Sequence, residues 1–335
     1  MKRSGQRMAR IIVTGGSGFI GTNAVEHFFN RGDKVLNLDI KPPQNGAHYP
    51  YWVKCDILNL EMYQEVAVSF DPEFWVHLAA RTDLHETQSI DGYITNTVGV
   101  SNTIKVISQC PHVAHAIFAS SRMVCRIGYQ PTSDEDYCPP NLYGESKVLG
   151  ERMVRNCQIM AGWTIVRPTS IWGPWFDVPY RLFFDSVRRG NYVQPKGLNP
   201  EKSFGYVGNT VFQIARLLTT PRQLVDKKVI YLCDYPPLHL LQWANLVSKQ
   251  FGRNGIVEVP LVLLKAAASV GDVAYRLGWL RVPLTSFRLS NLVCPMLHET
   301  ATLESVCGPL PYSLEEGVRL TISWMRSHKT HENAK

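Results

Sequence analysis

Short apolar runs alternate with longer stretches of helical spacing through the first half of the chain. We expect six β-strands there, at residues 11–13, 35–39, 52–53, 74–78, 116–121 and 163–167. The segments between them, such as 93–109 and 142–159, carry apolar residues three and four positions apart, and this spacing predicts helices. Strand and helix in strict alternation predict a parallel sheet covered by helices on both faces.

The pattern changes after Pro174. Proline, glycine and aromatic residues are dense over residues 172–200, and residues 211–218 predict a helix. Residues 229–233 predict one more strand, which we expect to rejoin the first sheet, and helices dominate beyond residue 250. We therefore expect an α/β protein with a smaller, mainly helical second lobe. The sheet domain would take residues 1–175, with 205–245 returning to it, and the lobe would take residues 176–204 and 246–330.

Composition sets limits on the class of protein. Of the 335 residues, 45% are hydrophobic and 19% are charged, which is typical of a globular protein with a sizeable core and excludes a disordered or collagen-like chain. No apolar stretch reaches the ~18 residues of a membrane-spanning helix. The best candidate, residues 256–270, is interrupted by Glu258, Pro260 and Lys265. We expect residues 260–270 to be core, with an apolar pocket lining or a membrane contact as the alternatives.

Charge, histidines and cysteines argue against several kinds of partner. The net charge of +7 suits an anionic ligand, but the basic residues lack the interleaved aromatic residues that single-stranded nucleic acid requires. The ten histidines show no metal-binding spacing, so we expect no metal. The eight cysteines form no CxxC pair, which predicts free thiols in a reducing compartment and hence a cytoplasmic location.

A glycine-rich turn follows the first predicted strand and opens the first predicted helix. Gly15, Gly18 and Gly21 have GxxGxxG spacing, which allows a tight turn and a close approach of the backbone to a pyrophosphate. The N–H groups at the start of the helix would bind the phosphates. Asp39 ends the second strand, where a carboxylate accepts hydrogen bonds from ribose hydroxyls and repels a 2′-phosphate. This arrangement favours NAD over NADP.

Further motifs occur in a fixed order along the chain. They are TGGSGFIG at 14–21, CDI at 55–57, HLAA at 77–80, SS at 120–121, YGESK at 143–147, RPTSIWGP at 167–174 and PYSLEEG at 311–317. Their order and spacing resemble the extended short-chain dehydrogenase/reductases, in particular the nucleotide-sugar epimerase/dehydratase group. The resemblance covers nearly the whole chain. It implies a Rossmann-type doubly wound parallel sheet, NAD as cofactor, a nucleotide-sugar substrate and a homodimer formed partly by the helix that carries YGESK.

The same resemblance assigns site residues by position. It places at the cofactor Gly15, Gly18, Phe19, Ile20, Gly21, Asp39, Asp56, Ile57, Leu78, Ala79, Ala80, Asn96, Tyr143, Lys147 and Pro168. The catalytic residues would be Ser121, Tyr143 and Lys147. Tyr143 and Lys147 lie four positions apart and share one helix face, where we expect the ammonium to lower the pKa of the phenol. Tyr143 would then take a proton from a sugar hydroxyl or give one to a ketone, with Ser121 bonded to the same oxygen.

The expected reaction starts with hydride transfer from a carbinol carbon to NAD, which gives a 4-keto sugar. Return of the hydride to the other face inverts the carbon, whereas loss of water gives a 4-keto-6-deoxy sugar. The retaining dehydratases of this group carry an Asp-Glu pair just after the catalytic residue, and here Arg122 and Met123 take those positions. We therefore favour epimerisation.

Two other functions stay open. One is an NAD(P)-dependent dehydrogenase or ketoreductase acting on a nucleotide sugar or on an apolar, sterol- or lipid-like alcohol. The other is a non-catalytic relative that only binds the dinucleotide, and the presence of both Tyr143 and Lys147 argues against it.

The candidates for substrate binding are Arg122, Ser170, Lys202 and Arg288. KSFGYVGN at 202–209 resembles the group's RDFxYVxD, so that Lys202 replaces a diphosphate-binding Arg, and Arg288 lies where a second such Arg is expected. Ser170 stands where several UDP-sugar epimerases carry Asn. Arg122 could contact an anionic substituent such as a uronate carboxyl, or could lie at the surface.

Overall fold

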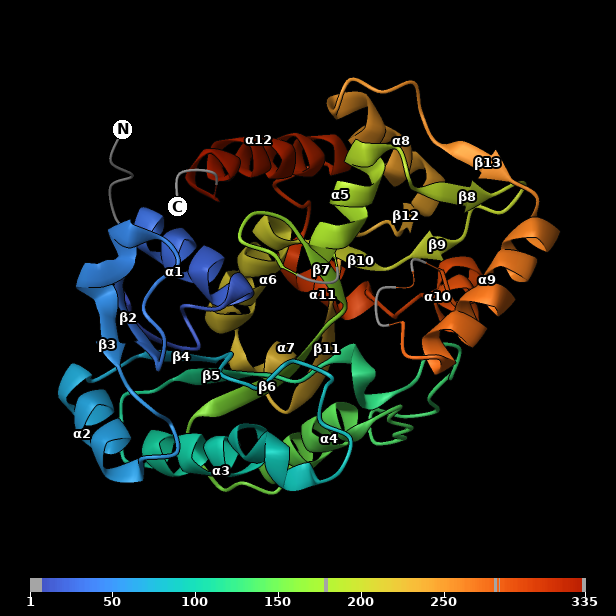
Figure 1. Ribbon diagram of the computed structural model, residues 1–335. Helices are drawn as coiled ribbons and strands as arrows, with labels where there is room; N and C mark the ends of the chain where they lie inside the picture. Colours follow the sequence, from blue (N-terminus) through green and yellow to red (C-terminus); the bar gives the residue numbers. More distant parts are fainter. Residues whose placement is uncertain (1–7, 178–179, 280–281, 283, 333–335) are drawn as a thin grey trace.

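The computed structural model describes residues 8–177, 180–279, 282 and 284–332. In these ranges a seven-stranded parallel sheet lies at the centre of the larger part of the molecule (Figure 1). Its strands are β1 (Arg10–Thr14), β2 (Lys34–Asp39), β3 (Trp52–Lys54), β4 (Phe74–His77), β5 (His115–Ala119), β6 (Gly162–Pro168) and β11 (Lys228–Leu232). The expected α/β fold with a parallel sheet is confirmed. The strand expected at 229–233 does rejoin the sheet, because β11 pairs with β6 in parallel.

Alternating side chains of β1 show how the sheet is covered on both faces. Ile11 and Val13 belong to one buried cluster and Ile12 to another, and all three are completely buried. The first cluster includes α1 (Phe19–Arg31) and α6 (Val207–Thr219), and the second includes α2 (Leu60–Phe70) and α3 (Ile94–Ser108), with α4 (Leu142–Arg155) packed beside α3. In Figure 1 these two helical layers lie above and below the sheet.

The strand order places a ligand crevice near the middle of the sheet. The order is β11-β6-β5-β4-β1-β2-β3, so the chain moves outward on one side of β1 and then crosses to the other side at β4. In open parallel sheets, ligands bind at the carboxyl ends of the strands where this reversal occurs. The loops after β1, β4 and β5 meet at this edge, and they carry the glycine-rich turn, HLAA and Ser121.

The rest of the chain consists of helices and short strand pairs that lie between β6 and β11 or follow β11. The short strands are β7 (Ser170–Trp172), β8 (Val193–Pro195), β9 (Glu201–Lys202), β10 (Phe204–Tyr206), β12 (Leu238–His239) and β13 (Val257–Val259). The helices are α5 (Tyr180–Arg189), α7 (Arg222–Val225), α8 (Leu240–Gln250), α9 (Leu261–Arg276), α10 (Ser286–Val293), α11 (Ala301–Cys307) and α12 (Leu314–Glu332). Trp172 and Trp243 contact each other in an aromatic core under α5 and α8, with ring centroids 5.3 Å apart. Trp172 on β7 therefore ties these helices to the end of the sheet.

Helix α9 corrects one expectation. Residues 260–270 were expected to be core, yet Val262 and Val270 are 76% and 70% exposed. Only Leu264, Ala268 and Gly271 of this helix are buried. The apolar residues of α9 thus occupy two faces, and one of them has no covering element among the residues that the structure describes.

A buried ion pair connects α4 to β6. The guanidinium of Arg167 donates two hydrogen bonds of 2.8 Å to the carboxylate of Glu151, and both side chains are 1% exposed. The same carboxylate accepts hydrogen bonds from Ser120 at 2.5 Å and from Tyr137 at 3.0 Å. Glu151 therefore joins the end of β5, the strand β6 and the segment before α4.

We predict that Arg167→Met lowers the free energy of unfolding by about 3–5 kcal/mol, because it leaves the Glu151 carboxylate buried without its cation. Urea unfolding followed by tryptophan fluorescence measures this. The double variant Glu151→Leu/Arg167→Met should recover most of the loss. Arg155→Met, which removes a half-exposed ion pair with Glu135, is the control and should cost less than about 1 kcal/mol. A single variant as stable as this control would contradict the prediction.

Candidate active site

The glycine-rich turn is closed by backbone hydrogen bonds and packs tightly on the loop after β4. The N–H of Gly15 donates to the carbonyl of Leu38 at 2.8 Å, and that of Gly18 donates to the carbonyl of Gly15 at 3.0 Å. Gly15 has a φ of +73°, and a Cβ there would lie 2.6 Å from the backbone nitrogen of Ala79. A Cβ on Gly21 would overlap the Gly15 carbonyl. Larger residues are therefore excluded at both positions.

This turn leaves the start of α1 open toward the crevice. Among the described residues, no side chain caps the helix at Gly18, so its first N–H groups are free to bind phosphate oxygens. The carboxylate of Asp39 lies beside the turn and accepts hydrogen bonds from the N–H groups of Ser17 at 3.1 Å and Lys41 at 2.9 Å. The turn and Asp39 thus fit the pyrophosphate and the adenosine ribose of a dinucleotide.

The other residues expected at the cofactor fall into two groups. Asp56, Ile57, Leu78, Ala79, Ala80 and Pro168 follow or end the strands β3, β4 and β6 at the same edge of the sheet. Asn96 is different, because its side chain is buried and bonded to protein groups. It accepts a hydrogen bond from the N–H of Arg81 at 2.8 Å and donates to the hydroxyl of Ser146 at 2.9 Å. Asn96 therefore attaches the loop after β4 to α4.

Ser121 and Tyr143 meet at the carboxyl edge of the sheet. Ser121 follows β5 and precedes the 3₁₀ helix η3 (Arg122–Val124), where its hydroxyl accepts a hydrogen bond from the N–H of Met123 at 3.1 Å. Tyr143 lies in the first turn of α4, and its side chain is close enough to that of Ser121 for Ser121 to lower its pKa. Each residue is 8% exposed. The two hydroxyls can therefore bind one substrate oxygen.

The protonation of Tyr143 corrects another expectation. Burial raises the pKa of the phenol above its ordinary value, and the nearby Ser121 side chain lowers it by less. The ammonium of Lys147 lies 6.0 Å from the centroid of the ring and is not among the groups that shift this pKa. Tyr143 therefore carries its proton at neutral pH in the free protein, and it is a proton donor in that state.

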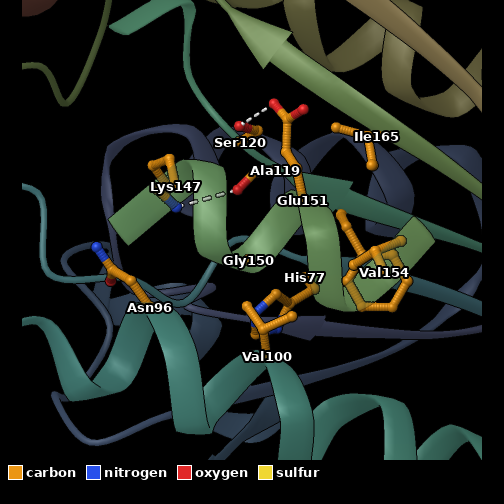
Figure 2. Close-up of a pocket in the computed structure, with 11 residues that line it drawn as sticks. His77, Asn96, Val100, Ala119, Ser120, Lys147, Gly150, Glu151, Val154 and Ile165 are labelled. Atoms are coloured by element: carbon orange, nitrogen blue, oxygen red, sulfur yellow. Dashed lines mark hydrogen bonds between the residues drawn. The ribbon is translucent and has the colours of Figure 1, made fainter. Parts of the chain in front are cut away.

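Lys147 is a buried cation beside a small cavity (Figure 2). Its ammonium donates a hydrogen bond to the carbonyl of Ala119 at 3.0 Å, and burial lowers its pKa to about 8. The cavity of ≈20 Å³ has room for one water and is also lined by His77 and Glu151. Burial lowers the pKa of His77 to about 3, so its ring is neutral, and its Nε2 has no hydrogen-bond partner within the described ranges.

Arg122 and Ser170 both lie near Tyr180. The buried side chain of Ser170, at the start of β7, is close enough to the hydroxyl of Tyr180 to lower its pKa. The guanidinium of Arg122 is close enough to Tyr180 and Lys202 to shift the pKa of each. The structure therefore brings these two expected substrate residues to one place.

Lys202 and Arg288 lie in different surroundings. Lys202 is 3% exposed, and its ammonium donates hydrogen bonds to the carbonyl of Asn291 at 2.8 Å and to that of Cys294. Burial lowers its pKa to about 8. Arg288 is exposed on α10 and donates to the carbonyl of Val282 at 2.6 Å. The ammonium of Lys202 is thus bonded to backbone carbonyls in the free protein.

Sequence reasoning missed three residues of this region. Glu151 lies four positions after Lys147 on the same helix face, so helical spacing was a signal that could have indicated it. Tyr180 and His298 come from segments outside the recognised motifs, and nothing in their local sequence pointed to them. The ring of His298 stacks on Tyr231 with centroids 4.1 Å apart.

A doubly wound parallel sheet with an open phosphate-binding turn and a Ser-Tyr-Lys set at its carboxyl edge defines a dinucleotide-dependent oxidoreductase of Rossmann type. The family comparison is more specific. The chain belongs to the NAD dependent epimerase/dehydratase family, whose model matches residues 11–233. It is an enzyme, and its cofactor is NAD.

Relatives of several activities share this sequence pattern and fold. A 3-beta-hydroxysteroid dehydrogenase of Mycolicibacterium neoaurum is 27% identical over 265 residues, which cover 73% of this chain and 71% of that protein. The decarboxylating sterol-4-alpha-carboxylate 3-dehydrogenase of Saccharomyces cerevisiae is 23% identical over 347 residues, which cover 94% of this chain and 97% of that protein. The structure of UDP-glucose 4-epimerase from Thermotoga maritima superposes with a TM-score of 0.70 at 20% identity, covering 95% of this chain and 99% of that chain. The last comparison shows the fold alone.

We predict that Lys147→Met stabilises the cofactor-free protein at pH 7 by on the order of 2–3 kcal/mol, because burial of the ammonium opposes folding. The pKa of Lys147 falls from 10.5 in the unfolded chain to about 8 in the folded protein. The free-energy cost of burying this ammonium is complete below pH 8 and disappears as the pH rises from 8 to 10.5. The difference in the free energy of unfolding between variant and wild type, measured with urea, should therefore shrink over that pH interval. Lys249→Met, on the exposed side of α8, should show no such pH dependence, and an equal profile for both variants would contradict the assignment.

Proposed function

We propose that this protein is an NAD-dependent nucleotide-sugar epimerase that acts through a transient keto sugar. The observation that carries the proposal is that the side chains of Ser121 and Tyr143 come together beside the buried Lys147, at the edge of the sheet where the phosphate-binding turn also lies. The catalytic residues in this proposal are Ser121, Tyr143 and Lys147.

In the proposed mechanism the protein's own residues handle the proton. Bound NAD would accept hydride from the carbinol carbon and return it. Tyr143 carries its proton in the free protein, so it first releases that proton to solvent. The phenolate then takes the hydroxyl proton as the alcohol becomes a ketone and gives it back in the reverse step. Ser121 orients the same oxygen. Lys147 remains a cation at neutral pH, since its pKa is about 8, and it stabilises a phenolate when Tyr143 loses its proton.

Charge on the substrate side supports an anionic substrate. Lys202 is buried and Arg122 is half-buried, and the charge of Arg122 helps to lower the pKa of Lys202. A nucleotide sugar is an anion whose negative charge would compensate this positive charge. Arg122 and Met123 stand where an acid/base pair for dehydration would be needed, and neither can act as one. Epimerisation therefore fits these residues better than 4,6-dehydration.

A dehydrogenase acting on an apolar, sterol- or lipid-like alcohol is the second candidate. The ammonium of Lys202 is held by the carbonyls of Asn291 and Cys294 in the free protein, so the expected diphosphate contact requires these bonds to break. The two relatives described above are named as a hydroxysteroid dehydrogenase and a sterol dehydrogenase. In both candidates Tyr143 transfers the same proton. They differ in the substrate that occupies the site.

We further propose the assembly and location expected from the sequence, a cytoplasmic homodimer with residues 176–204 and 246–330 as its substrate lobe. All eight cysteines lie in the described part of the chain and are free thiols, which supports a reducing compartment. Sedimentation of the purified protein would test the dimer.

The first test is an incubation of the NAD-loaded protein with a panel of nucleotide sugars and apolar secondary alcohols, with products read by mass and proton NMR and NADH by absorbance. A product of unchanged mass with an inverted ring proton and no net NADH supports the epimerase. Stoichiometric NADH with an apolar alcohol supports the second candidate, and loss of water contradicts the role given to Arg122 and Met123.

We predict that Tyr143→Phe lowers kcat/KM by about 10²- to 10⁴-fold on whichever substrate turns over, because the proton no longer has an acceptor. NAD binding, measured by calorimetry, should change little. Tyr49→Phe removes the hydroxyl of a tyrosine that is 53% exposed and is the control. A Tyr143→Phe enzyme with wild-type turnover would overturn the mechanism.

A further inference from the structure

Arg122 is half-buried and lines a pocket together with Tyr231 and His298. In the part of the chain that the structure describes, its guanidinium makes no hydrogen bond or ion pair. Burial lowers its pKa. A charged group withdrawn from water is costly to the fold unless an opposite charge or hydrogen bonds compensate it. The residue therefore has unsatisfied binding capacity that a ligand can use.

The groups around Arg122 add to the positive charge. The charge of Arg122 lowers the pKa of both Lys202 and His298, which burial brings to about 8 and about 4. The hydroxyls of Tyr180 and Tyr231 are the other titratable groups that sense Arg122. Arg167 also acts on His298, but its own charge is compensated by Glu151. No carboxylate of the described residues contributes to the pKa of Arg122, so an anion must come from outside the protein.

The position of Arg122 in the chain favours an anion close to the reacting carbon. Arg122 directly follows Ser121, whose hydroxyl would hold the reacting oxygen. On a nucleotide sugar that reacts at C4, a uronate carboxylate is attached to the neighbouring C5, whereas the diphosphate is attached at the anomeric carbon across the ring. The planar guanidinium also matches a carboxylate with two parallel hydrogen bonds.

We propose that Arg122 binds a carboxylate of the substrate, carried on the carbon next to the reacting carbinol, so that the enzyme prefers acidic sugars such as uronates over neutral ones. This inference rests on the proposed function, because it takes Ser121 and Tyr143 as the groups that bind the reacting oxygen. It assigns Arg122 a role in substrate specificity.

The test compares substrate pairs that differ only in the carboxylate. One pair is a nucleotide uronate and the matching nucleotide hexose, and the other is a β-hydroxy acid and its amide. For the wild type we expect kcat/KM and binding to the NAD-loaded protein to favour the acid by about 10- to 100-fold. Arg122→Gln should abolish that preference, because it lowers kcat/KM for the acid by much more than for the neutral member. Arg189→Gln, an equal change of charge on the exposed end of α5, should keep it.

The outcomes separate this inference from the proposed function. Turnover of both members of a pair with equal kcat/KM overturns the role of Arg122 and leaves the epimerase intact. If Arg122→Gln lowers kcat/KM equally for both members, the role of Arg122 is also overturned. That result indicates a contact with the diphosphate or a structural role. Turnover of the hydroxy acid alone, with the preference intact, overturns the nucleotide-sugar proposal and supports the carboxylate site. No turnover of any member overturns both.

A second inference rests on a different observation, the uncovered face of α9. Val262, Val270 and Val273 recur with Ala266 at spacings of three and four residues, so they form one continuous apolar face, which Leu277 extends. Leu277 and Trp279, directly after the helix, are 75% and 71% exposed. The opposite face is buried through Leu264 and Ala268 against α10. Figure 1 shows α9 at the outer rim of the molecule.

The charges that border this face select its occupant. Lys265 and Arg276 are exposed on α9, while the carboxylate of its one acidic residue, Asp272, accepts a hydrogen bond from the N–H of Ser286 at 3.0 Å. An exposed apolar face with cations along its edge and a tryptophan at its end is typical of a helix that lies in a membrane interface. None of the helices in the described ranges is long and apolar enough to cross a bilayer. We infer that α9 binds the surface of an anionic lipid membrane.

Flotation with vesicles tests this surface. The full chain should float with vesicles of phosphatidylglycerol and phosphatidylcholine, should float less with phosphatidylcholine alone, and should lose binding as salt is added. Val270→Glu should lower the partition coefficient by more than about tenfold. Met160→Glu, which changes a 92% exposed methionine elsewhere, should bind as the wild type does.

Two results would overturn the lipid assignment. One is equal flotation of the wild type and Val270→Glu, or no flotation of the wild type with either kind of vesicle. The other is a dimer in sedimentation that Val270→Glu dissociates, since a second copy of the chain would then cover the face.

Discussion

The carboxylate of Glu151 is the contact on which the active site depends. It receives two hydrogen bonds from Arg167 on β6 and one from Ser120 at the end of β5, and it lies one helical turn after Lys147. These bonds fix α4 against the two strands that carry the site. Since Ser121 follows Ser120 and Tyr143 lies on the same helix, the distance between the two hydroxyls is set by a group that touches neither of them.

The site also concentrates buried positive charge. Lys147, Arg122 and Lys202 all have a pKa lowered by burial, and each would be more stable in water. Lys147 and Lys202 are partly compensated by backbone carbonyls, and Arg122 is not. Functional sites commonly retain such costs because the same groups stabilise charge on a ligand or during a reaction. The fold that surrounds them, with its fully buried sheet and ion pair, supplies the stability that they reduce.

Much of the fold could be predicted from periodicity, and much of the cofactor site from glycine spacing. The strand from 229 to 233 was correctly expected to rejoin the sheet, because its apolar run is too short for a helix and too apolar for a loop. The expectation that residues 260–270 are core was wrong for Val262 and Val270. A helix with two apolar faces has the same composition whether one or both faces are covered, so periodicity alone could not show which face lies open.

The sequence by itself determined the alternation of strand and helix, the phosphate-binding turn and the position of Tyr143 one turn before Lys147, because these depend on residues close together in the chain. The tertiary structure decided the charge state and the partners of the site residues. Tyr143 keeps its proton because of how deeply it is buried, and Lys202 is bound by carbonyls about 90 residues away in sequence. Burial and long-range contacts arise only when distant segments pack together, and no local pattern encodes them.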